Sequence, residues 1–174
     1  MSGDFAHSLK IDSIRDGDRL DLAASEEERR ATAERLGLDS IDRLEAHAVL
    51  ARKGLVVEAH GRVTASLRQN CVVTGDPVAA HLDEPFDIVF APEPQPERSD
   101  QEVELGSADC DVVFHDGGSI DLGAAIADTL ALALDPYPRS AGAEAALREA
   151  GVISEEQAGP FAALAALKMG SEGS

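Results

Sequence analysis

Residues 54–77 contain the clearest alternation of apolar and polar side chains in this sequence. The positions on one side of the alternation are Leu55, Val57, Ala59, Val63, Ala65 and Leu67, and charged or polar residues dominate the other side. A period of two is that of a β-strand with one buried face. The pattern therefore predicts a long strand, which ends at the turn sequence Thr74-Gly75-Asp76-Pro77.

A second alternating segment, residues 41–51, precedes this strand and places Leu44, Ala46, Ala48 and Leu50 on one side. A two-residue loop at Lys53-Gly54 would join the two segments as an antiparallel hairpin. This register sets Glu45 opposite Arg62 and His47 opposite His60. Because opposite charges at facing positions stabilise paired strands, the charge pattern agrees with the register.

The N-terminal part begins with an extended segment over residues 5–22 and continues with a helix. Ser25 is followed by three glutamates, which is typical of an N-cap with acidic residues in the first helical turn. Gly37 is a plausible end for such a helix. We therefore expect a helix near 26–36.

The second half adds a third strand at 78–91, a short strand at 110–115 and another helix. Ser119 or Asp121 caps that helix, whose apolar face carries Leu122, Ile126, Leu130 and Leu134. Together these elements predict an α+β fold, an antiparallel β-meander with packed helices. At 174 residues the chain is expected to be one domain, since domains usually span about 100–200 residues.

Two segments depart from this pattern. Residues 92–109 hold three prolines in an acidic run and are expected to form a mobile loop. The C-terminal tail, 139–174, carries a weak helix near 143–150 and a short helix at 160–168. On that last helix the candidate docking residues Phe161, Leu164 and Leu167 share one side. It would dock either on its own domain or on a partner.

The net charge of −18 is unevenly distributed. Residues 41–75 hold five basic and three acidic side chains, whereas 76–174 hold four basic and twenty acidic ones. An acidic surface repels nucleic acid phosphates and attracts basic proteins, so DNA binding is not expected and RNA contact would be confined to the basic region. The alternative is that the acidic residues only keep the protein in solution.

The termini and cysteines favour a cytoplasmic protein. No apolar run approaches the roughly 18–20 residues that cross a bilayer, and the N-terminus lacks the basic and apolar regions of a signal peptide. Two widely separated cysteines do not suggest a disulfide framework. We therefore expect no membrane contact.

Several motifs taken together resemble the YceD family, the large ribosomal RNA subunit accumulation proteins. They are the segment Gly61–Leu67 continued through Cys71 to Pro77, then Ile120-Asp121-Leu122, Leu132–Pro136, and Pro160-Phe161 with Leu164, Leu167 and Lys168. The resemblance implies a cytoplasmic bacterial protein, or an organellar relative, that is needed for accumulation of the large-subunit ribosomal RNA. It therefore implies a link to ribosome assembly and no known enzymatic activity.

The sequence departs from the family at one position. The resemblance implies a Cys-x-x-Cys pattern, which many family members carry at this strand end, but here Thr74 stands three residues after Cys71. A structural zinc site needs about four nitrogen or sulfur ligands, so we expect no metal and no cofactor. Cys110 lies between Asp109 and Asp111, whose carboxylates disfavour a thiolate, and is expected to be inert.

If Cys71 were a catalytic nucleophile, it would need a histidine as its base. Cys71 with His60, His81 or His115 is a conceivable combination. However, the sequence contains no nucleophile elbow and no glycine-rich phosphate loop, and it has no metal-ligand spacing. A buried structural cysteine is the simpler interpretation, and we expect no catalysis.

Five basic residues are the candidates for binding RNA or another partner: Arg43, Arg52, Lys53, Arg62 and Arg68. No aromatic residue lies within 41–68, so base stacking is unsupported and phosphate contacts would dominate. The alternative is that the same residues only solubilise an outer sheet face. The expected partner is large-subunit ribosomal RNA or its precursor particles, reached directly or through a ribosomal protein or assembly factor. The alternative is an acidic adaptor that holds a basic ribosomal protein without touching RNA.

Overall fold

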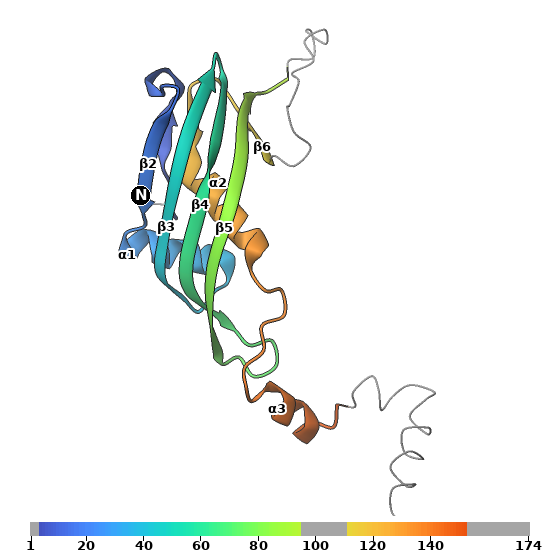
Figure 1. Cartoon of the computed structure of the whole chain (residues 1–174). Coiled ribbons are helices and arrows are strands. Elements are labelled where there is room, and N and C mark those ends of the chain that lie inside the picture. Colours follow the sequence, from blue (N-terminus) through green and yellow to red (C-terminus); the bar gives the residue numbers. More distant parts are fainter. Residues whose placement is uncertain (1–3, 95–110, 153–174) are drawn as a thin grey trace, which may run out of the picture. The chain divides into compact units, whose positions relative to one another are not determined.

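The computed structural model describes residues 4–94 and 111–152, which belong to two compact units (Figure 1). Of the described residues, 4–69, 79–94 and 111–136 belong to the first unit, and 70–78 and 137–152 belong to the second. The elements are β1 (Ser8–Lys10), η1 (Ile11–Ser13), β2 (Asp18–Ala23), α1 (Glu26–Leu36), β3 (Ser40–Lys53), β4 (Val56–Asn70), β5 (Pro77–Pro92), β6 (Asp111–His115), β7 (Ser119–Asp121), α2 (Leu122–Ala133) and α3 (Ala143–Glu149). The prediction that the whole chain is one domain stays a prediction.

A five-stranded sheet with the order β2-β3-β4-β5-β6 forms the centre of the first unit. This confirms the predicted α+β class and the third strand. The edge strand β6, however, pairs parallel with β5, beginning with Ile88 opposite Asp111. Side-chain alternation is the same in parallel and antiparallel strands, so the sequence pattern gave no sign of this reversal.

The hairpin of β3 and β4 is shifted by two residues from the predicted register. Glu45 lies opposite Thr64 and His47 opposite Arg62, so both predicted facing pairs are wrong. The cause lies in the loop, which is Gly54-Leu55, with Gly54 at a φ of +64°. A positive φ at the first loop position is typical of the type II′ turns that join twisted strands. A shift of two residues leaves the buried and exposed faces unchanged.

The predicted helix over 26–36 is confirmed as α1, with the expected signals at both ends. The Ser25 side chain accepts a hydrogen bond from the Glu28 backbone N–H at 3.3 Å, and Glu28 Oε2 accepts from the Ser25 N–H at 2.7 Å. This reciprocal capping box satisfies two backbone donors at the start of the helix. Gly37 ends it in the left-handed conformation, with a φ of +66°.

Asp121 is the cap of α2, since its side chain accepts from the Ala124 N–H at 3.0 Å. Leu122, Ile126 and Leu130 are completely buried on the predicted apolar face. The helix passes behind the strands in Figure 1 and packs into the core with the inner side chains of the sheet. Those inner side chains include Leu44, Ala46, Ala48, Leu50, Val57, Ala59, Val63, Ala65 and Leu67, as the alternation predicted.

The N-terminal segment closes this core through distant contacts. β1 pairs antiparallel with β7, with Ser8 opposite Asp121. The His7 backbone N–H donates to Asp121 Oδ1 at 3.0 Å, and the Phe5 N–H donates to the buried Thr32 hydroxyl at 2.9 Å. The bond from Phe5 satisfies the hydroxyl of Thr32, which is completely buried.

Some predictions fall on residues that the structure does not describe. They are the acidic segment from residue 95 to 109, Cys110, and the helix at 160–168 with Phe161, Leu164 and Leu167. The weak helix near 143–150 is confirmed as α3.

Gly61 is an inner β4 position that only glycine fits. A Cβ atom there would meet the backbone oxygen of His47 and would lie 2.7 Å from Phe86 Cζ. We predict that Gly61→Ala lowers the free energy of unfolding by about 1–3 kcal/mol, because the added carbon overpacks the core. Chemical denaturation measures this effect. Gly118→Ala is the control, since its Cβ would meet only Asp116 Oδ1 at 3.5 Å, and an equal loss in both variants would contradict the explanation.

Candidate functional site on the open sheet face

One face of β2–β5 points away from α2, and we call it the open face. Two cross-strand rows lie at its centre. Asp21, His47 and Arg62 form the first row, because His47 is paired with both of the others, on β2 and on β4. Ala23, Glu45 and Thr64 form the second row in the same way. The face therefore brings together side chains from strands that are separated in sequence by α1.

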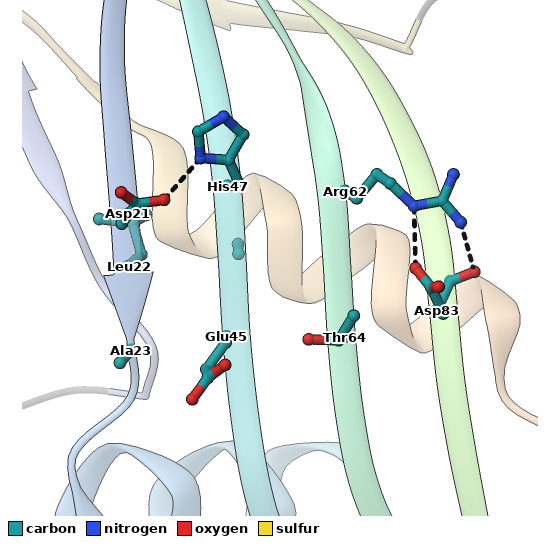
Figure 2. Close-up of a pocket in the computed structure, with 9 residues that line it drawn as sticks. Asp21, Leu22, Ala23, Glu45, His47, Arg62, Thr64 and Asp83 are labelled. Atoms are coloured by element: carbon teal, nitrogen blue, oxygen red, sulfur yellow. Dashed lines mark hydrogen bonds and ion pairs between the residues drawn. The ribbon is translucent and has the colours of Figure 1, made fainter.

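A hollow of about 550 Å³ lies over these rows (Figure 2). It is lined by Asp21, Leu22, Ala23, Glu45, Ala46, His47, Arg62, Thr64 and Asp83. Its residues therefore include three carboxylates, one guanidinium and one imidazole. The small side chains of Ala23 and Thr64 leave room beside Glu45 in Figure 2.

The Arg62 side chain forms hydrogen bonds with Asp83 on β5. Its Nε lies 2.9 Å from Asp83 Oδ1, and one terminal nitrogen donates to the Asp83 carbonyl oxygen at 3.4 Å. The hydrogen bond to Asp83 raises the pKa of Arg62. Figure 2 shows the guanidinium reaching toward Asp83 and away from Asp21.

The two other carboxylates of the hollow differ in their partners. Asp21 Oδ1 lies 2.5 Å from Nδ1 of His47, an imidazole without a fixed charge. Glu45 Oε2 accepts from Arg43 at 2.7 Å, and this hydrogen bond lowers the pKa of Glu45 and raises that of Arg43. Arg43 itself lies outside the hollow's lining.

All five predicted basic residues have carboxylate partners. In addition to the pairs of Arg43 and Arg62, the ion pairs are Arg52 with Asp12 at 3.5 Å, Lys53 with Glu58 at 3.6 Å and Arg68 with Asp42 at 3.2 Å. Exposed pairs of this kind are weak, so a phosphate can compete for the cations. The role of these five residues in binding stays a prediction, but they do not form a patch of unpaired positive charge.

The histidines considered as bases have other partners. His60 Nδ1 lies 2.9 Å from Asp87 Oδ1, and His81 Nδ1 lies 3.2 Å from the Ser66 hydroxyl. His115 is buried, with Nε2 2.8 Å from the Leu55 carbonyl oxygen and Nδ1 accepting from the Gly117 N–H at 2.9 Å. Within residues 4–94 and 111–152, no group of three or more histidine, cysteine or acidic side chains is arranged to hold a metal ion.

Cys71 is buried in the second unit, in the turn between β4 and β5. Its sulfur accepts from the Ser140 N–H at 3.3 Å, from the Ser140 hydroxyl at 3.4 Å and from the Thr74 N–H at 3.5 Å. These donors lower the pKa of the thiol to about 6, chiefly through the Ser140 hydroxyl and then through Thr74, while burial opposes them. The hydrogen-bond partners found for this sulfur do not include a histidine.

Sequence reasoning missed several residues of these sites. The outward position of Asp83 follows from the alternation in β5, so its exposure could have been predicted. Asp21 gave no such signal, because pairing between β2 and β3 spans α1. Ser140 is 69 positions from Cys71 in the sequence, and nothing in its local sequence indicates the hydrogen bonds to the Cys71 sulfur.

The fold and site define a mixed α+β protein whose sheet exposes one polar, ion-paired face. Residues 59–168 match the family model described as Large ribosomal RNA subunit accumulation protein YceD. The match covers more than half of the chain, so the chain belongs to the YceD family, as the motifs suggested. No curated protein and no solved structure gives a significant match.

The matched region contains β5, α2 and α3 and the part of β4 that carries Arg62 and Thr64. The family description supports a role in accumulation of the large-subunit ribosomal RNA. The parts of the hollow contributed by β2 and β3 lie before the matched residues. Across the described ranges, the helices are all too short or too polar to cross a bilayer.

We predict that the Cys71 thiol titrates near pH 6 and that Ser140→Ala moves its pKa upward, toward the ordinary value of 9.0. Ultraviolet absorbance of the thiolate in a Cys110→Ala background measures this titration. Because folding lowers the pKa, the thiolate's contribution to stability should be complete above about pH 9 and lost as the pH falls through 6. Ser13→Ala is the control, since its hydroxyl donates to the Lys10 carbonyl instead. An unchanged titration in Ser140→Ala would refute the explanation.

Proposed function

We propose that this protein acts in the cytoplasm, without catalysis, as a binding factor in assembly of the large ribosomal subunit. The observation that carries the proposal is the open face of the sheet in a chain of the YceD family. That face presents charged side chains and a broad hollow between β2 and β5. Such a surface suits a macromolecular partner better than a small substrate, which needs an enclosed and mostly apolar pocket.

The arrangement of reactive side chains also supports a role without catalysis. A nucleophilic cysteine needs a base within hydrogen-bonding distance. The Cys71 sulfur has only donors among its hydrogen-bond partners in the described residues, and His115 is held by backbone groups. These residues therefore have structural interactions that account for their positions.

One partner of this factor would be large-subunit ribosomal RNA or a precursor particle that contains it. Arg43, Arg62 and Arg68 lie on β3 and β4 with side chains that are 45–67% exposed. They are accessible to a phosphate backbone that displaces their weak ion pairs. Under this proposal the contacts carry little sequence information, because contacts to phosphates do not read the bases.

A second candidate is the adaptor that holds a basic ribosomal protein and makes no RNA contact. The observation that favours it is the carboxylate partner of each of the five predicted cations. An RNA backbone must displace these carboxylates, whereas a basic protein can share them. The overall charge of −18 adds a long-range attraction for basic partners.

The proposed function is tested in cells that lack the protein. We predict a lower level of large-subunit ribosomal RNA and fewer mature large subunits in sucrose gradients, with recovery when the wild-type gene returns. The Cys71→Ala variant should also restore assembly if it folds, because the proposed function uses no nucleophile. Normal ribosome profiles in the deletion strain would contradict the proposal, and a folded Cys71→Ala variant that fails to restore them would favour an enzyme.

The choice between direct RNA contact and the adaptor is tested by Arg62→Glu combined with Arg68→Glu. If these arginines contact phosphates, we predict at least about a tenfold weaker association with precursor particles, with a shallower salt dependence. The matched control is Arg30→Glu with Arg148→Glu, two exposed helix positions with the same change in charge. Association equal to that of the control would exclude direct contact through Arg62 and Arg68 and favour the adaptor.

A further inference from the structure

We propose that the hollow on the open face binds a lysine or arginine side chain of a basic protein segment between Asp21 and Glu45. This inference rests on the proposed function and gives the chemistry of one partner at that surface. It locates the contact on β2 and β3, which contribute most of the hollow's lining. The sequence-predicted basic residues, in contrast, lie chiefly along β3 and β4.

The first argument is the charge balance of the hollow. Three carboxylates face one guanidinium, and that guanidinium is turned toward Asp83. The carboxylate of Asp21 is 87% exposed, and its partner His47 has no fixed positive charge. Asp21 is therefore available to an incoming cation without loss of a permanent ion pair.

The second argument is the position of Glu45 in the next row. Ala23 lies opposite Glu45 on β2, and the row of Asp21 is two residues away along the strand. The Glu45 side chain is 41% exposed beside its partner Arg43, and the partner approaches from outside the lining. A carboxylate has two oxygens that each accept hydrogen bonds, so Glu45 can hold a second cation.

The third argument is the shape of the hollow. Ala23 and Thr64 flank Glu45 with short side chains, and the volume is about 550 Å³. Lysine and arginine place a flexible aliphatic stem on such a surface while the charged group remains solvated. The hollow therefore fits a long cationic side chain better than a bulky planar base.

The same features disfavour a nucleic acid at this place. A phosphate in the hollow would face the carboxylates of Asp21, Glu45 and Asp83. The lining contains no phenylalanine, tyrosine or tryptophan, and its one imidazole ring, that of His47, is hydrogen-bonded to Asp21. Arg19 on β2, opposite Val49, is exposed, and no ion pair of Arg19 is found within the described ranges. It does not line the hollow, so it does not offset the three carboxylates there.

The test titrates the full chain with a synthetic peptide in which arginine and lysine alternate with glycine, and separately with an oligouridylate. We expect the peptide to shift the amide resonances of the Ala23, Glu45 and Thr64 row more than those of α1. Asp21→Asn combined with Glu45→Gln should weaken peptide binding by about fivefold to tenfold at low salt, since each removed charge lowers the attraction.

The matched control is Glu27→Gln with Glu34→Gln, two exposed α1 positions that remove the same charge. The control should bind the peptide like the wild type. Equal weakening in both variants would show attraction to net charge alone and would overturn the inference. Binding of the oligouridylate at the same resonances would also overturn it, in favour of RNA. A normal ribosome profile in the deletion strain, with the peptide site intact, would instead refute the proposed function alone.

Discussion

The register of the β3–β4 hairpin is the constraint on which the rest of the sheet depends. Gly54 adopts a φ of +64° in the two-residue loop, and the pairing of fourteen-residue and fifteen-residue strands follows from that turn. The register places Gly61 opposite Ala48, where the core needs space for the Phe86 ring. On the other face it aligns His47 with Arg62 and Glu45 with Thr64. The register therefore determines both the packing of the core and the arrangement of polar side chains on the open face.

Local sequence signals predicted much of this fold because they act over short distances. The Ser25 cap, the Gly37 end and the alternation in β3 and β4 each depend on a few neighbouring residues. The exact hairpin register was not predictable from charge complementarity, since a shift of two residues preserves both faces. The energy of one exposed charge pair is smaller than the steric cost that residues other than glycine meet in left-handed backbone.

The candidate site was harder to predict than the fold, because its residues come from pairings between distant segments. The basic residues were found from sequence, but their carboxylate partners were not. Asp83 and Asp12 lie on other elements, and they change an apparent positive stripe into a set of ion pairs. A local excess of basic residues in a sequence thus does not establish a positive surface. Its potential depends on which acidic side chains the fold brings beside it.

Similar reasoning applies to the turn that carries Cys71. Thr74 stands three residues after Cys71, and the Cys71 sulfur accepts hydrogen bonds from Thr74 and Ser140. The Val72 N–H also donates to the Pro138 carbonyl at 2.9 Å. Hydrogen bonds thus link two segments of the second unit, and such links need no bound ion.

The pairing of β1 with β7 has a consequence for the order of folding. The hydrogen bond between His7 and Asp121 joins residues 114 positions apart, and closing so long a loop costs more conformational entropy than forming a hairpin. During synthesis, β3 and β4 can pair as soon as both have left the ribosome, while Phe5 and Ile11 must wait for β7 and α2. Until β7 and α2 have formed, these two side chains lack the groups that bury them in the folded protein. The nascent chain therefore passes through a stage in which β3 and β4 are paired while Phe5 and Ile11 are still exposed.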